Sequence, residues 1–79
     1  MENPVREVVE VVCRVGKLTE LAPDRDIFEA GFESIDSLEL LVELEGIFDV
    51  SIPDDKYVQC RTAEALAAMI ARLTEEAGR

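Results

Sequence analysis

The chain has 79 residues, of which 48% are hydrophobic and 5% aromatic, and it carries a formal net charge of −10 at pH 7 with no histidine. This apolar content excludes a wholly disordered chain, and the length predicts one small domain over residues 1–79. The strong negative charge argues against a nucleic-acid-binding protein, which needs basic residues to neutralise phosphates.

The negative charge is concentrated in the middle of the sequence. Residues 26–55 contain ten acidic residues and no Lys or Arg, whereas the rest of the chain carries eight acidic and eight basic residues. Such a block either keeps the surface soluble or attracts basic protein partners, and composition alone does not separate the two. We expect no membrane segment, because no apolar run approaches the length that crosses a bilayer.

The first predicted element is a helix over residues 4–16. Asn3 and Pro4 are typical of an N-cap and a first helical position. Valines follow at helical spacing, with Glu and Arg between them: Val5, Val8, Val9, Val12 and Val15. A long connection is expected up to about residue 33, with Phe28 as its anchor to the core.

A second helix is predicted over residues 34–48, whose composition strongly favours helix. At about 100° per residue, one arc of this helix is the expected core face. That arc holds Leu40, Leu41, Leu44, Ile47 and Phe48.

The same helix has a second apolar side, opposite the core face, formed by Ile35, Leu38 and Val42. An acidic stripe formed by Asp36, Glu39 and Glu43 runs along the edge of the core face. The second apolar side either contacts another helix or is an exposed strip for a protein partner.

Two further helical segments complete the predicted fold. Pro53 interrupts the chain before a short turn over about residues 55–59, and Thr62 is a good N-cap for a last helix over 62–75. The buried stripe of that helix is expected to consist of Leu66, Ala67, Ile70 and Leu73. The predicted fold class is all-α, a small bundle of three to four helices.

The cysteines, Cys13 and Cys60, match no zinc or redox spacing, so two buried thiols are expected and no disulfide. Because no signal peptide is visible, we expect a reduced, cytoplasmic setting. Asp54, Asp55 and Glu64 lack the spacing of a calcium loop, and no metal site is predicted.

Residues 31–40 read Gly-Phe-Glu-Ser-Ile-Asp-Ser-Leu-Glu-Leu. This segment resembles the one around the modified serine of acyl carrier proteins, with Ser34 in the place of that serine. Downstream, Phe48-Asp49 and Ile52-Pro53-Asp54 stand at the family's spacing, and residues 26–31 are similar to the family's preceding loop. This loop resembles that of carriers in polyketide and peptide assembly lines more than that of carriers in fatty acid synthesis. The resemblance is continuous over about residues 24–55.

The sequence departs from the family pattern at three positions. Glu33 replaces the usual Asp before the serine, Ile35 replaces the Leu after it, and Ala30 replaces a Leu. Asp36-Ser37-Leu38 is a literal Asp-Ser-Leu and therefore a competing match. Ser34 is favoured over Ser37, because choosing Ser37 displaces every other landmark by three residues and because Ser37 lies within the core-facing arc.

The resemblance implies a non-catalytic carrier with a 4′-phosphopantetheine arm on Ser34, transferred from coenzyme A by a phosphopantetheinyl transferase. The arm holds acyl groups as thioesters in fatty acid, polyketide or related specialised biosynthesis. The residues alone argue against catalysis by Ser34, because the chain has no histidine to act as its base.

By the same resemblance, acyl-loading and acyl-processing enzymes use basic patches on their own surfaces to dock on the second helix of this chain. The implied docking residues are Glu33, Ile35, Asp36, Leu38, Glu39, Val42 and Glu43. From Met1 and the free tail we expect a discrete, type II carrier that acts as a monomer. Two alternatives stay open: an aminoacyl or peptidyl carrier, and an unmodified acidic interaction module with the same fold.

Overall fold

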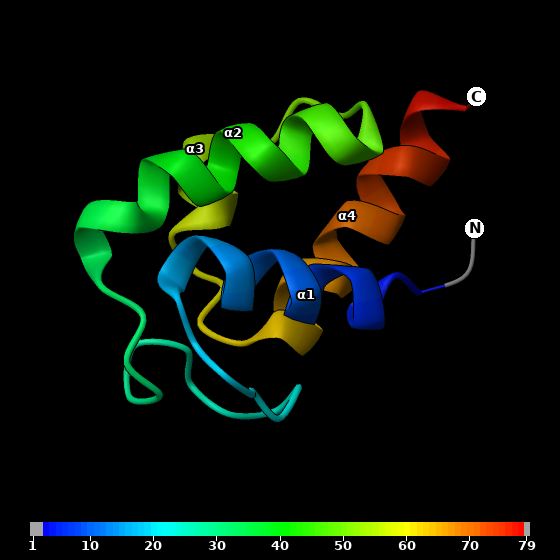
Figure 1. Cartoon of the computed structure of the whole chain (residues 1–79). Helices are drawn as coiled ribbons and strands as arrows, with labels where there is room; N and C mark the ends of the chain where they lie inside the picture. Colours follow the sequence, from blue (N-terminus) through cyan, green and yellow to red (C-terminus); the bar gives the residue numbers. More distant parts are fainter. Residues whose placement is uncertain (1–2, 79) are drawn as a thin grey trace.

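The computed structural model describes residues 3–78, and within this range the only regular secondary structure is helical. The chain forms α1 (Val5–Gly16), a 3-10 turn η1 (Ser34–Asp36), α2 (Ser37–Phe48), α3 (Asp54–Tyr57) and α4 (Ala63–Ala77) (Figure 1). The predicted all-α bundle is therefore confirmed, with four α-helices. None of the helices in residues 3–78 combines the length and apolarity needed to cross a bilayer.

The core lies where α1 packs against α4 and α2. Its most deeply buried large side chains come from these three helices: Val8, Val12, Leu40, Leu44, Leu66 and Ile70. Val11 is buried as well, whereas Val9, which the predicted stripe included, is only half-buried. Because α1 packs against both α4 and α2, its buried face is made of Val8, Val11, Val12 and Val15.

The ends of α1 and α4 show which capping predictions were right. Thr62 is the N-cap of α4, as predicted, and its Oγ1 accepts a hydrogen bond from the Ala65 N–H at 3.0 Å. Asn3 is not the cap of α1, because Pro4 occupies that position and no side chain bonds there. Lys17 ends α1 in the left-handed conformation and donates its N–H to the Cys13 carbonyl.

The long connection over residues 17–33 is held to the core by Leu21, Ile27 and Phe32. Phe28, the predicted anchor, does pack against the core, but its side chain is only half-buried there. Its ring meets that of Phe32 edge-on, with 5.9 Å between centroids. Phe32 lies two residues before Ser34, so one of these core contacts is close to the predicted modification site.

Candidate functional site

Ser34 is the first residue of η1 and is exposed, following Glu33 in an extended conformation. The Asp36 N–H donates to the Glu33 carbonyl and the Ser37 N–H to the Ser34 carbonyl, which closes a tight turn. The predicted single helix from residue 34 is thus a 3-10 turn followed by α2 from Ser37. The turn lies at the opposite end of the molecule from the start of α1 and the end of α4 (Figure 1).

Ser37, the competing serine, has a different environment. It is half-buried, and its carbonyl accepts a hydrogen bond of 2.7 Å from the Tyr57 hydroxyl. Burial raises the pKa of Tyr57 to about 12, so this hydroxyl remains a protonated donor at neutral pH. The bond fixes the end of α3 beside the start of α2. Ser37 and Tyr57 also line a small cavity of about 140 Å³.

The second apolar side of α2 is open to solvent. The exposed fractions of Ile35, Leu38 and Val42 are 82%, 70% and 59%. Of the two alternatives that the sequence left open, contact with another helix is therefore excluded within the described residues. Sequence reasoning missed Val58, which is 71% exposed and shares the small cavity with Ser37. Its only signal was an apolar residue within the short turn predicted over about residues 55–59.

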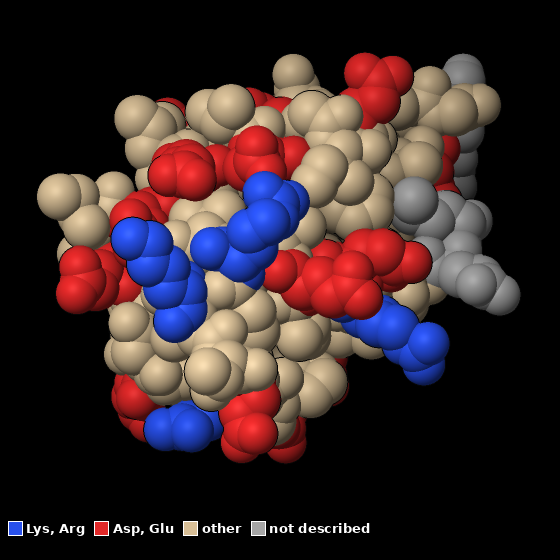
Figure 2. Space-filling model, viewed as in Figure 1, with Lys and Arg blue, Asp and Glu red and all other residues tan. Residues whose placement is uncertain are grey.

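The acidic side chains along α2 differ in how free they are. Glu33 and Glu39 are exposed and Asp36 is half-buried. Glu43 forms an ion pair with Arg14 of α1. On the face seen in Figure 2, basic side chains lie directly below the acidic ones that cover α2. Glu45 accepts the Ile52 N–H at 2.8 Å. Glu43 and Glu45 therefore also stabilise the fold.

One expectation for the core face of α2 was wrong. Ile47 is 50% exposed, although its helical angle places it in the arc that contains Leu40 and Leu44. It follows Glu43 by one turn on the same face. Because Glu43 meets Arg14 at the surface, this edge of the arc borders solvent and not the core.

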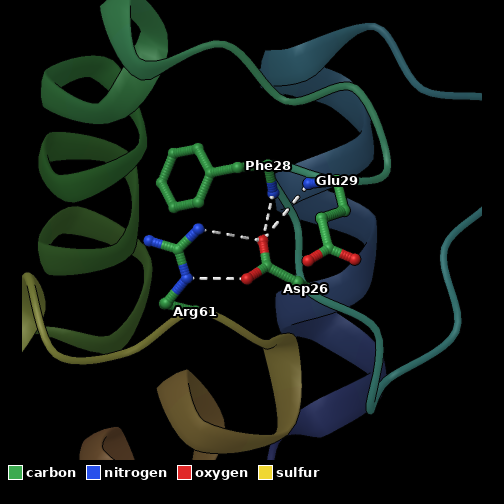
Figure 3. Close-up of polar contacts among 4 residues, drawn as sticks. All are labelled: Asp26, Phe28, Glu29 and Arg61. Carbon is green, nitrogen blue, oxygen red and sulfur yellow. Dashed lines mark hydrogen bonds and ion pairs between the residues drawn. The ribbon is translucent and has the colours of Figure 1, made fainter.

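Asp26 fastens the loop before Ser34 to the connection between α3 and α4 (Figure 3). Its Oδ2 accepts the Arg61 Nε–H at 2.6 Å, and its Oδ1 accepts the Phe28 and Glu29 N–H groups at 2.9 and 3.2 Å. The guanidinium of Arg61 lies 4.8 Å from the centroid of the Phe28 ring. We call this set of contacts the Asp26–Arg61 clamp. Nothing in the sequence signalled it.

The clamp continues along the backbone toward Ser34. The Ile27 N–H donates to the Arg61 carbonyl at 2.8 Å, and the Phe32 N–H donates to the Ile27 carbonyl at 2.9 Å. Hydrogen bonds from Arg61 and from the two backbone N–H groups lower the pKa of Asp26, so its carboxylate is charged at neutral pH. The residues that precede Ser34 are therefore held in place, while Ser34 itself projects into solvent.

The other candidate chemistries receive no support from the geometry. Burial raises the pKa of both Cys13 and Cys60, whereas a reactive thiol needs a lowered pKa. Both cysteines are half-buried and not disulfide-bonded. Between residues 3 and 78, no three His, Cys, Asp or Glu side chains gather as a metal site would require.

The sequence was compared with those of known protein families. Residues 4–70 match the family described as "Phosphopantetheine attachment site". The chain belongs to the family of phosphopantetheine-binding carrier proteins. These carriers are not enzymes, and their cofactor is phosphopantetheine, supplied by a phosphopantetheinyl transferase.

Curated relatives of the chain carry a more specific name. It is 32% identical to the D-alanyl carrier protein of Lactococcus lactis subsp. cremoris strain MG1363, over 96% of this chain and 99% of the relative. The D-alanyl carrier proteins of strain SK11 and of Lactococcus lactis subsp. lactis strain IL1403 match with the same identity and coverage. The similarity therefore extends over nearly the whole length of both proteins.

Proposed function

We propose that Ser34 carries the phosphopantetheine arm and that the arm holds an aminoacyl group, D-alanine in the first instance, as a thioester. The observation that carries the attachment site is the exposure of Ser34 at the start of η1, directly before α2 and after a loop that the Asp26–Arg61 clamp holds in place. Ser37 is the poorer candidate, because it is half-buried beside Tyr57.

The attachment chemistry assigns a simple role to the chain. The Ser34 Oγ attacks the pyrophosphate phosphorus of coenzyme A that bears the pantetheine; the new P–O bond forms, the P–O–P bridge breaks, and adenosine 3′,5′-bisphosphate leaves. The proton passes to a base of the transferase, because serine needs a base and this chain has no histidine. The attached arm ends in a thiol, which holds the cargo as a thioester.

Partner enzymes dock, in this proposal, on η1 and the start of α2. The exposed strip of Ile35, Leu38 and Val42 supplies apolar contact, and Glu33, Asp36 and Glu39 supply negative charge at its rim. Glu43 contributes at the edge, through a carboxylate already paired with Arg14. Rim charges of this kind mainly raise the association rate, which suits a monomeric carrier that passes between a transferase and loading enzymes.

The cargo assignment departs from the fatty acid or polyketide service that the sequence first suggested. It is supported by the full-length similarity to proteins named D-alanyl carriers.

The attachment site is tested by intact mass after incubation with coenzyme A, magnesium and a broad-specificity transferase. We expect the wild type to gain the mass of one phosphopantetheine and Ser34→Ala to gain none. Ser37→Ala is the matched control and should be modified normally, because only the backbone carbonyl of Ser37 bonds to Tyr57. Modification of Ser34→Ala would rule the assignment out.

The cargo is tested separately, on protein purified from its own cells under mildly acidic conditions that preserve thioesters. Hydroxylamine should release the cargo as its hydroxamate and free the thiol of the arm, with D-alanine hydroxamate as the expected product. Release of a fatty or polyketide acyl group would leave the attachment site intact and overturn the aminoacyl proposal.

A further inference from the structure

A half-open groove of about 650 Å³ lies between α3, the following connection and α4. Its volume is in the range of ligand pockets. It is lined by no residue of α1, η1 or α2, so it is separate from the proposed docking strip. We call it the α3–α4 groove.

The side of the groove formed by α4 is apolar. Ala65, Ala68, Met69 and Leu73 follow one another at helical spacing along this wall. Three of them are only half-buried in the chain, and Met69 is buried beneath them. Small alanines let an incoming chain approach the helix closely, so this wall has the character of a helix-binding surface.

The rim of the groove is basic, in contrast with the rest of the molecule. Lys56 lies at the α3 side and Arg72 at the α4 side, and both are exposed. Neither forms an ion pair within the part of the chain that the structure describes, where the pairs join Arg14 to Glu43 and Arg61 to Asp26. The one acidic residue that lines the groove is Glu76, which follows Arg72 by one turn of α4.

The charge at the groove differs from that of the central block. Residues 26–55 have ten acidic and no basic residues, whereas the lining of the groove contains two basic residues and one acidic residue. A partner segment that suits the α2 strip therefore does not suit the groove. Two exposed cations above an apolar wall complement a segment with apolar side chains on one face and carboxylates at its edges.

We propose that the α3–α4 groove is a second docking site, which binds an acidic amphipathic helix of a partner protein. The apolar face of that helix lies on Ala65, Ala68 and Leu73, and its carboxylates meet Lys56 and Arg72. Because the two sites share no residue and have opposite charge, one enzyme can hold the groove while Ser34 remains free. The proposal does not depend on modification of Ser34.

The test uses the full chain labelled with ¹⁵N and two designed helical peptides with the same leucine stripe, one with glutamates and the other with lysines at the remaining positions. We expect the glutamate peptide to shift the amide resonances of Gln59, Ala68 and Leu73, and to do so equally in Ser34→Ala. The lysine peptide should instead shift Ile35 and Leu38. A glutamate peptide that leaves the groove resonances unmoved would overturn the proposal.

Charge variants separate specific docking from general attraction. Lys56→Gln with Arg72→Gln should weaken binding of the glutamate peptide about five- to tenfold, from two partly exposed ion pairs. The matched control is Arg6→Gln with Lys17→Gln, which removes the same charge from exposed positions outside the groove. Equal weakening by the two pairs would overturn the proposal. So would groove shifts that depend on the protein's own concentration, since the occupant would then be a second copy.

Discussion

Gly16, the last residue of α1, allows the loop before Ser34 to pack on the helix. A Cβ at this position would lie 2.5 Å from Cδ2 of Phe32, and Phe32 is only 2% exposed. Gly46, inside α2, has no atom within 4 Å of its corresponding Cβ position. The two glycines are both helical, and they differ in whether a neighbouring ring occupies the space of a side chain.

This difference gives a paired prediction. Gly16→Ala should lower the free energy of unfolding by about 1–3 kcal/mol, because the Phe32 ring must move in a filled core. Gly46→Ala should raise it by about 0.5–1 kcal/mol, because alanine reduces the freedom of the unfolded chain and meets no obstacle. Urea unfolding followed by circular dichroism measures both. Equal effects of the two substitutions would show that Phe32 does not fill the space beside Gly16.

Ser34 and Ser37 illustrate what can be predicted at the scale of a residue. Family spacing favoured Ser34, and helical angles placed Ser37 toward the core, where the structure has it half-buried. The bond from Tyr57 to the Ser37 carbonyl joins residues 20 positions apart. No local pattern indicates such a bond, because it depends on where α3 comes to rest.

At the scale of elements, the Asp26–Arg61 clamp joins two irregular connections, one between α1 and η1 and the other between α3 and α4. The loop before Ser34 contributes Asp26, and the connection before α4 contributes Arg61. A further backbone bond, from the Glu64 N–H to the Pro23 carbonyl at 3.0 Å, ties the start of α4 to the same loop. The clamp therefore makes the position of η1 depend on the position of α4.

Asp26→Asn should remove the pH-dependent contribution that the Asp26–Arg61 ion pair makes to the free energy of unfolding. The Arg61 hydrogen bond holds the pKa of the folded Asp26 carboxyl below its ordinary 3.8, so its ion pair stabilises the fold above that pH. This contribution is lost as the pH falls through the lowered pKa. The difference in unfolding free energy between wild type and Asp26→Asn should therefore be constant near neutrality and shrink below about pH 4.

Urea unfolding at a series of pH values measures this difference. Asp24→Asn is the matched control, because Asp24 is an exposed carboxylate in the same loop. It should show a smaller difference at neutral pH. A wild type and Asp26→Asn that lose stability in parallel down to pH 3 would contradict the assigned role of the ion pair.

At the scale of the whole molecule, charge is separated between two surfaces. The acidic stripe of Asp36, Glu39 and Glu43 lies on η1 and α2, whereas the basic rim of the α3–α4 groove lies on α3 and α4. The molecule extends over 37 × 22 × 19 Å, and the two surfaces share no residue. At about 8 Å of screening length in physiological salt, each surface mainly directs the partner that approaches it.

The field of α2 should control encounter with the transferase. Neutralising Glu33, Asp36 and Glu39 as amides should lower kcat/KM for phosphopantetheine transfer about tenfold at low salt, and by less as salt rises. The matched control neutralises Glu7, Glu10 and Glu75, which are exposed on α1 and α4. If the control lowers kcat/KM as much, net charge and not the α2 strip directs the transferase.

Local sequence patterns predicted the helical segments, the cap at Thr62 and the two apolar sides of the second helix, and family spacing favoured Ser34, whose modification stays a prediction. These follow from periodicity and short-range hydrogen bonding, which act within a few residues. Only the tertiary structure decided that Ile35, Leu38 and Val42 are uncovered, that Ile47 is half-exposed and that Val11 is buried. It also paired Arg14 with Glu43 across 29 positions and Arg61 with Asp26 across 35. The reason is physical: which face of a helix is covered, and which charges meet, depends on the neighbours that packing brings to it.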